Sequence, residues 1–199
     1  MRGFSIVRRW LYWGPICSLV GLLIPGCAVD ESLSVPPVAV NEVRLIDNFE
    51  WATISVENDP FWEEVSESVP CPPEAHAPDP EIGDVWYTVE TRLCNYLSVQ
   101  QSLKVAVTQG DAIELRVYQS VQVSGTEFAL SIAFGDEIVA TEAFSPAPTG
   151  SGMRLVRWVA RRDWPAGTRV VWNVSNDGVN SWSIITLTAA SSTATLTDN

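Results

Sequence analysis

The sequence has little positive charge. Its 199 residues include 12 lysines and arginines against 24 aspartates and glutamates, which gives a net charge of −12. Proteins that bind nucleic acid gain affinity by neutralising phosphates with basic side chains. The acidic excess therefore argues against nucleic acid as a partner, and equally against electrostatic adhesion to anionic lipid.

Histidine and catalytic motifs are scarce. His76 is the only histidine, and its segment, PCPPEAHAPDPE, predicts an exposed loop residue without a catalytic role. No nucleophile motif accompanies it. Glycoside hydrolysis needs two carboxylates flanking one bond, and no spacing selects a pair here. The sequence favours a non-enzyme, with a glycan-directed hydrolase as an alternative. The candidate carboxylates for that alternative are Glu81, Asp84, Glu90, Asp111 and Glu114.

Patterns typical of metal sites are missing too. Zinc would need more than Cys71 and His76, and no Cys-x-x-Cys accompanies them. No Asp-x-Asp-x-Asp loop is present for calcium. Aspartates near turns commonly bond their own backbone, so a structural calcium is possible but not favoured, and we expect no cofactor. The turn aspartates considered for calcium are Asp111, Asp136 and Asp177.

No apolar run is long enough to predict a permanent membrane span. The run from Trp10 to Ile24 has about fifteen residues and is broken by Gly14 and Pro15, whereas a spanning helix needs roughly twenty. The nine residues at the start contain three arginines and no acid. A basic start and a short apolar stretch predict that residues 1–26 are a cleaved secretory signal peptide.

The end of this leader, Ile24-Pro25-Gly26-Cys27, resembles the lipobox of bacterial lipoproteins. The resemblance implies cleavage before Cys27, lipidation of its thiol and a membrane anchor. Ala28 follows the cysteine in place of the aspartate that retains such proteins in the inner membrane, which implies the outer membrane. The alternative is ordinary cleavage after Ala28, which would give a secreted or periplasmic protein.

Cysteine numbers agree with lipidation. Cys17 lies in the leader, and three cysteines remain after it. If Cys27 carries lipid, Cys71 and Cys94 are left as one pair, for which we predict a disulfide in an oxidising compartment. On the chain-entropy model, closing this loop stabilises the fold by roughly 3 kcal/mol.

The chain beyond the leader divides into three parts. Residues 27–41 lack periodicity and contain prolines, so we expect a flexible tether. Residues 42–189 are predicted to form one domain, and residues 190–199 a frayed tail. Without its leader the chain would have a net charge of about −15, because three arginines and no acids are removed.

Period-two alternation dominates residues 42–189. Apolar residues from Phe128 to Phe134 alternate with smaller ones, Gly135-Asp136 offers a turn, and residues 138–144 return as a hairpin partner. Similar alternation predicts strands at 103–107, 113–117, 170–174 and 182–188. In the segment from Met153 to Val159 two adjacent apolar residues obscure the alternation and predict a bulge. These patterns predict an all-β, antiparallel β-sandwich.

The segment from Gln109 to Thr188 resembles jelly-roll sandwiches of the galactose-binding and carbohydrate-binding-module kind. Each of its four features precedes or forms a strand. They are Gly110-Asp111, the 128–143 hairpin, Trp164-Pro-Ala-Gly167 and the segment from Asn176 to Trp182. Residues 93–97, LCNYL, also resemble lipoproteins of Gram-negative bacteria, a resemblance that implies no activity.

Tryptophan is the most informative residue type. Seven tryptophans follow the leader, and flat aromatic faces suit the apolar face of a sugar. Trp62, Trp164 and Trp182 lie beside predicted turns, so they are the candidate ligand-binding residues. Trp86, Trp158 and Trp172 are expected in the core. We therefore expect a non-catalytic binding protein of the cell envelope whose ligand is a glycan or an envelope protein, or alternatively a subunit of a surface assembly.

Overall fold

The computed structural model describes residues 41–62, 69–80, 84–121, 128–144, 150–176 and 178–191, all within the compact unit Val38–Asn199. The leader, Cys27, the tether before residue 41, and the tail from 192 lie outside the described residues, as do Glu81 and Asp177. The predictions for them stay predictions. Within the described ranges, no helix has the length and apolar character that a membrane crossing requires.

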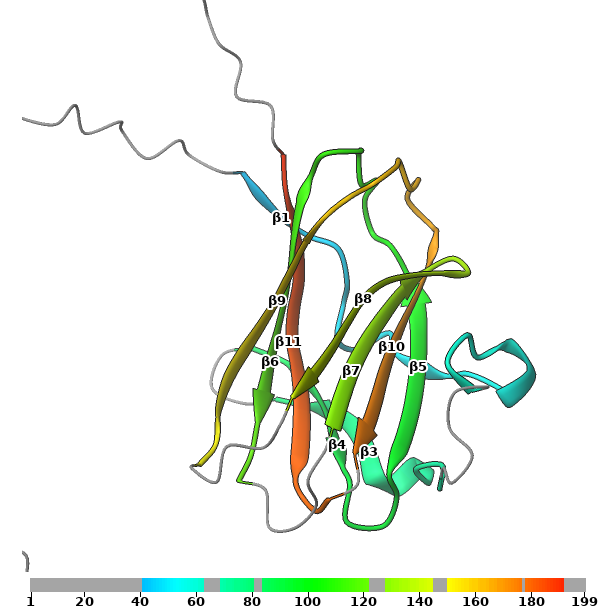
Figure 1. Ribbon diagram of the computed structural model, residues 1–199, viewed down its shortest axis with the longest axis vertical. Coiled ribbons are helices and arrows are strands. Elements are labelled where there is room, and N and C mark those ends of the chain that lie inside the picture. Colours follow the sequence, from blue (N-terminus) through cyan, green and yellow to red (C-terminus); the bar gives the residue numbers. More distant parts are fainter. Residues whose placement is uncertain are drawn as a thin grey trace, which may run out of the picture. The chain divides into compact units, whose positions relative to one another are not determined.

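The described strands form two antiparallel sheets (Figure 1). The first has the order β3-β4-β11-β6-β9, and β1 also pairs with β11. Its strands are β1 (Glu42–Arg44), β3 (His76–Asp79), β4 (Trp86–Glu90), β6 (Ala112–Gln119), β9 (Gly152–Val159) and β11 (Ser181–Ala190).

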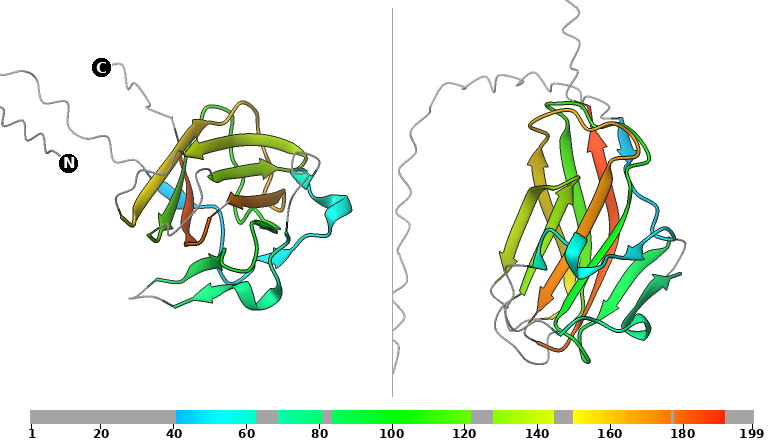
Figure 2. Two further views of the ribbon diagram at one scale, coloured as in Figure 1. Left: turned by 60° about the horizontal axis from the view of Figure 1, so that its bottom comes forward. Right: turned by 90° about the vertical axis from the view of Figure 1, so that its right-hand side faces the viewer.

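The second sheet has the order β2-β5-β10-β7-β8. Its strands are β2 (Ala52–Thr53), β5 (Tyr96–Ser102), β7 (Phe128–Phe134), β8 (Glu137–Phe144) and β10 (Arg169–Asn176). The short 3-10 turns η1 (Val56–Asn58) and η3 (Pro73–Ala75) lie in the connections. From β5 to β11 the chain repeatedly crosses between the two sheets, which face each other in Figure 2. The predicted all-β, jelly-roll-like β-sandwich is confirmed.

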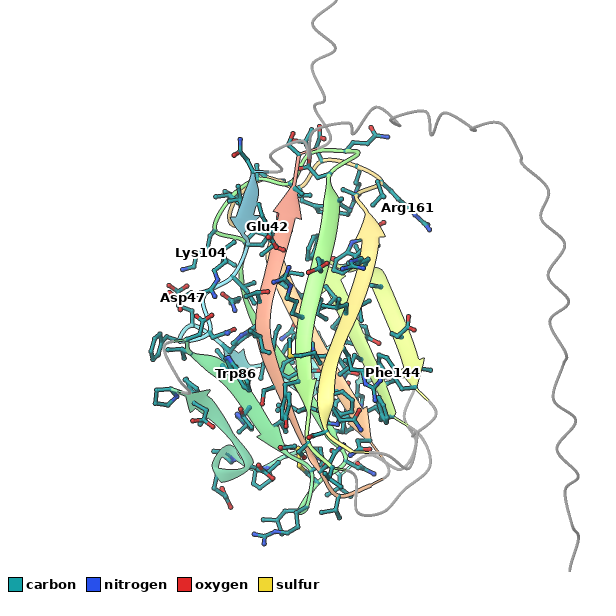
Figure 3. All side chains as sticks on the ribbon, turned by 90° about the vertical axis from the view of Figure 1, so that its left-hand side faces the viewer. Glu42, Asp47, Trp86, Lys104, Phe144 and Arg161 are labelled. Atoms are coloured by element: carbon teal, nitrogen blue, oxygen red, sulfur yellow. A yellow bond between two sulfur atoms is a disulfide. The ribbon has the colours of Figure 1, made fainter. Side chains whose placement is uncertain are left out.

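Alternation places side chains on the two faces of each sheet. In β6, Ile113 and Leu115 are each 1% exposed, whereas Glu114 and Arg116 point to the outer face. Figure 3 shows the first sheet from this side, with Glu42 and Trp86 labelled. The predicted 128–144 hairpin is confirmed: β7 pairs with β8, and Gly135 at the turn has φ of +61°. The strands expected at 113–117, 170–174 and 182–188 lie within β6, β10 and β11.

Two strand predictions are wrong in detail. No strand forms at 103–107: β5 ends at Ser102, and of the residues 103–107 only Val107 makes an isolated bridge, to Trp164. Alternation there reflects the burial of Leu103 and Val107 in an irregular segment. The bulge expected in β9 is absent, because β9 pairs with β6 in one continuous register. Leu155 is simply apolar and 46% exposed.

The core lies between the sheets and is rich in aromatic rings. Trp172 from β10 and Trp182 from β11 are both 0% exposed. Trp172 packs against Trp51 at 6.3 Å between ring centroids, and Trp182 packs against Phe128 at 4.4 Å. One continuous cluster therefore contains side chains from both sheets, which makes the sandwich one packing unit.

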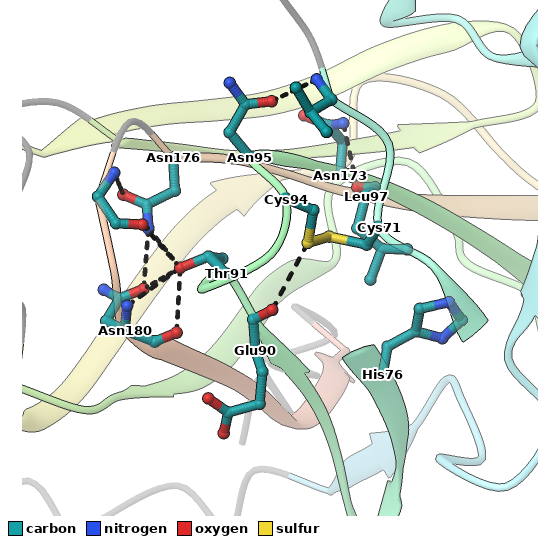
Figure 4. Close-up of a disulfide and its surroundings, with 12 residues drawn as sticks. Cys71, His76, Glu90, Thr91, Cys94, Asn95, Leu97, Asn173, Asn176 and Asn180 are labelled. Atoms are coloured by element: carbon teal, nitrogen blue, oxygen red, sulfur yellow. Dashed lines mark hydrogen bonds between the residues drawn. A yellow bond between two sulfur atoms is a disulfide. The ribbon is translucent and has the colours of Figure 1, made fainter. Parts of the chain in front are cut away.

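A disulfide joins Cys71 to Cys94, as predicted, and closes a sequence separation of 23 residues. Beside it lies a buried polar cluster of Thr91, Asn176 and Asn180 (Figure 4). The Asn176 amide donates to the Thr91 hydroxyl at 2.8 Å and to the Asn180 side-chain oxygen at 2.9 Å. Since buried polar groups need partners, this cluster fastens the β4–β5 corner to the β10–β11 turn.

Candidate binding site in the cleft between β8 and β9

The two sheets leave a cleft where their edge strands meet. β9 is the last strand of the first sheet and β8 the last of the second, and they lie side by side without pairing. The cleft has a volume of about 420 Å³, within the range of small-molecule sites. Its lining residues are Glu137, Ile138, Val139, Ala140, Thr141, Trp158, Val159, Ala160, Arg161 and Trp164.

Two tryptophans form the aromatic part of the cleft lining. Trp158 is half-buried near the end of β9, and Trp164 lies in the following loop with 4% of its surface exposed. Both rings pack against the fully buried Phe134, at centroid distances of 6.2 Å and 5.2 Å. Because Phe134 supports both from behind, the two rings have little freedom to turn.

Backbone hydrogen bonds hold the Trp164 loop in place. Trp164 and Val107 exchange two bonds, each 2.8 Å long, between backbone N–H and carbonyl groups. The Ala160 N–H donates to the Asp111 carbonyl, and the Gly110 N–H donates to the Ala160 carbonyl, both at 2.9 Å. The loop that carries Trp164 is thus tied to the β5–β6 connection at both ends, which preorganises this side of the cleft.

The opposite side of the cleft contains an irregularity in β8. The β7–β8 register shifts between Ile132 and Ala133, whose partners are Ala140 and Ile138, so Val139 is an extra residue. Such bulges bend an edge strand and redirect its side chains, and they are frequent beside binding sites. Here the bulge brings three successive apolar residues, 138–140, to the cleft.

Charged side chains lie beside Trp164. The Arg162 guanidinium lies 3.0 Å from the Glu137 carboxylate and 5.6 Å from the centroid of the Trp164 ring. This pair connects the loop after β9 to the start of β8. Arg161 also lines the cleft and is exposed; in Figure 3 it lies toward the same end of the molecule as Glu42.

The outer face of the first sheet has a second hollow, of about 360 Å³, beside the cleft. Glu114 lies there between Arg116 and Arg157, with its Oε2 2.6 Å from Arg157 Nε. Partial burial raises the pKa of Glu114, but the hydrogen bonds and charges of the two arginines outweigh burial and leave that pKa below its ordinary 4.5. Glu42 adds a second carboxylate 3.6 Å from Arg116, so the charges of this hollow balance.

A separate aromatic pair lies on the outer face; in Figure 3 its Trp86 is well below Arg161. Trp86 and Tyr118 are half-buried, with centroids 5.6 Å apart and ring planes 39° apart. Thr88 and Ser183 beside them share a hydrogen bond of 2.8 Å. The expectation that Trp86 is a core residue is therefore wrong, because the parity of β4 directs residues 86 and 88 outward.

The three candidate tryptophans, Trp62, Trp164 and Trp182, have different environments in the structure. Trp182 is 0% exposed inside the core, so its predicted place beside a ligand is wrong, because β11 is a central strand covered by the other sheet. Trp164 is less exposed than expected but lines the cleft. Trp62 is half-buried elsewhere, edge-on to Tyr96 at 5.4 Å. Trp158 packs against the core, as expected, but it also lines the cleft, which the sequence analysis missed; its nearness to a turn was the one available signal.

The other candidate residues have structural partners. The prediction that His76 is an exposed loop residue is wrong. His76 is the half-buried first residue of β3, and its Nδ1 lies 2.7 Å from the Tyr87 hydroxyl. Burial lowers the pKa of His76 and raises the pKa of Tyr87 to about 12.

The aspartates considered for catalysis or calcium also bond neighbouring groups. Asp84 makes two bonds to Arg44, Asp111 accepts from the Thr108 N–H, and Asp136 pairs with Arg169. Within the described ranges no group of three or more His, Cys, Asp or Glu side chains is placed to hold a metal.

No family model matches this chain, and no curated protein matches it. Among solved structures, a Stig cyclase from Fischerella sp. TAU is 14% identical with a TM-score of 0.39, over 55% of this chain and 64% of the cyclase. The N-terminal modules of an endo-1,4-β-D-xylanase from Clostridium thermocellum, complexed with xylohexaose, are 12% identical with a TM-score of 0.41, over 77% and 29%.

An arabinose-bound α-L-arabinofuranosidase is 9% identical with a TM-score of 0.46, over 73% of this chain and 26% of that enzyme. The chain thus spans less than two thirds of the length of each of these three structures. Likeness at this level says nothing about what this chain binds.

Proposed function

We propose that this chain is a non-catalytic binding lipoprotein of the bacterial cell envelope that recognises a glycan in the cleft between β8 and β9. Cys27 is the lipid anchor, residues 27–41 are the tether, and the β-sandwich carries the site. The observation that carries glycan binding is the pair Trp158 and Trp164 lining a preformed cleft.

The chemistry of the cleft suits a sugar. A pyranose has an apolar face of C–H groups and a polar edge of hydroxyls, so it requires aromatic faces together with a few polar groups. The cleft offers two indoles and the apolar residues 138–140, with Thr141, Glu137 and Arg161 among its polar groups. Because Phe134 and the backbone bonds of the loop already fix the rings, little ordering accompanies binding.

The test uses the mature chain with Cys27→Ser, titrated with polysaccharides and peptidoglycan fragments and followed by tryptophan fluorescence. We expect saturable binding by one glycan class, weakened about tenfold or more by Trp158→Ala. Trp86→Ala is the matched control, because Trp86 is also a half-buried tryptophan but lies outside the cleft; it should retain binding. Loss of binding in Trp86→Ala alone would move the site to the outer face, and no binding to any glycan would refute the proposal.

The lipid anchor has its own test. The full chain is expressed in a Gram-negative host and labelled with a palmitate analogue. We expect label in the membrane fraction, lost on Cys27→Ser and retained on Cys17→Ser, because Cys17 lies in the leader. Label retained without Cys27, or an unlabelled protein cleaved after Ala28, would contradict lipidation.

The second candidate function is a subunit of a surface assembly. Its support is β9, an edge strand whose outward residues Met153, Leu155 and Val159 are 50%, 46% and 58% exposed. Exposed apolar edge strands are surfaces for pairing with another chain. Cross-linking of the lipidated protein in its own membrane, with a reactive group at position 155, would identify such a partner.

A further inference from the structure

We infer that the glycan in the cleft is acidic, with a sugar carboxylate that pairs with Arg161. This inference rests on the proposed glycan-binding function and adds the class of sugar. It follows from how the basic side chains of the domain are partnered.

The domain has nine basic side chains, and most of them form ion pairs with carboxylates. Six form ion pairs with carboxylates. Arg154 donates to the Gln119 side chain and lies over the Phe144 ring. Among the described residues only Arg92 and Arg161 have neither an ion pair nor a side-chain hydrogen bond. The six ion-paired side chains are Arg44, Lys104, Arg116, Arg157, Arg162 and Arg169.

Arg161 is the one of these two that lines the cleft. The cleft's own acid, Glu137, is already balanced by Arg162 at 3.0 Å. The lining is therefore left with one uncompensated positive charge, in a chain whose acids outnumber its bases two to one. Such a local charge attracts an anion that the rest of the surface repels.

Carboxylate is the anion that fits both features of the cleft. A guanidinium presents a planar fork of donors that matches a carboxylate in two parallel hydrogen bonds. An acidic sugar carries this group on the ring that would lie against Trp158, the more exposed of the two indoles. One ligand thereby uses the aromatic lining and the unpaired arginine together.

The experiment compares two hexasaccharides with the same backbone, β-1,4-linked glucose and β-1,4-linked glucuronic acid. The Cys27→Ser mature chain is titrated with each by calorimetry at low and at 0.5 M salt. We expect the glucuronic acid hexamer to bind about five- to tenfold more tightly at low salt, because a partly exposed ion pair contributes modestly. The preference should shrink at high salt, since salt screens it.

Arg161→Ala should abolish the preference, so that the two hexamers bind with the same affinity. Arg92→Ala is the matched control, because it removes the same charge from an exposed turn outside the cleft lining; it should keep the preference. Equal or tighter binding of the neutral hexamer, or a preference that survives Arg161→Ala, overturns the acidic-sugar inference and leaves glycan binding standing. Failure of both hexamers and of the wider glycan panel would refute glycan binding itself.

Discussion

Glu114 shows how one side chain depends on its neighbours across the sheet. It projects from β6, and its two oxygens accept hydrogen bonds from Arg116 on the same strand and Arg157 on β9. Its side chain is 17% exposed, so solvent screens these bonds only in part. Since the arginines hold the pKa of Glu114 below 4.5, the carboxylate form stabilises the folded state.

We predict that Glu114→Gln lowers the free energy of unfolding by about 1 kcal/mol at pH 7. A carboxyl with a depressed folded-state pKa contributes stability above its unfolded pKa and loses it as pH falls through the folded value. The difference from the parent chain should therefore shrink as pH falls below 4.5, measured by urea unfolding from pH 7 to pH 3. Glu90→Gln, at an exposed residue, is the control; a difference independent of pH would contradict this account.

At the scale of the element, the β7–β8 hairpin depends on its two-residue turn. Gly135 has φ of +61°, a conformation that glycine adopts without the steric cost that other residues carry. The turn sets the register in which Phe134 lies opposite Glu137. Since β8 lines the cleft, this turn also positions one side of the candidate site.

We predict that Gly135→Ala destabilises the domain by about 1 kcal/mol. An added Cβ would meet nothing within 4 Å, so the cost comes from the backbone alone. Gly152→Ala is the matched control, because that site is equally open but has no positive φ; it should change stability by less than about 0.5 kcal/mol. Equal effects of the two substitutions in thermal unfolding would show that backbone conformation is not the cause.

At the scale of the whole molecule, the two sheets share one core. Trp172 belongs to one sheet and Trp182 to the other, and both are fully buried in the same cluster. The Cys71–Cys94 bridge lies at the β4–β5 corner, which connects the sheets, next to the buried Thr91 cluster. Because the core is formed by side chains from both sheets, separating the sheets would expose it, and we expect the two sheets to unfold together.

We predict one unfolding transition, coincident by tryptophan fluorescence and far-ultraviolet circular dichroism. The double substitution Cys71→Ser and Cys94→Ser should lower the free energy of unfolding by roughly 3 kcal/mol and keep the transition single. A reducing agent should shift the parent chain to the same degree and leave the double variant unaffected. Two separate transitions, or no shift on reduction, would disprove this picture.

Much of the fold could be predicted from the sequence. The 128–144 hairpin, the buried Trp172 and the disulfide between Cys71 and Cys94 are present as expected. The prediction failed at 103–107, where apolar residues alternate without forming a strand, because their burial comes from contacts with distant loops. Only part of the candidate site was predicted: Trp164 was a candidate and lines it, whereas Trp158, which packs against the core as expected, was not expected to line it.

The sequence by itself determined the strands β6, β7, β8, β10 and β11, the hairpin turn and the cysteine pairing, because each follows from local rules of alternation, glycine conformation and cysteine number. Only the tertiary structure decided which aromatic rings line a cleft. That choice depends on strand order: β11 is central, so Trp182 is covered, whereas β8 and β9 are edges, so Trp158 and Trp164 line the cleft between them. Strand order arises from pairings between residues far apart in the chain, which local patterns do not encode.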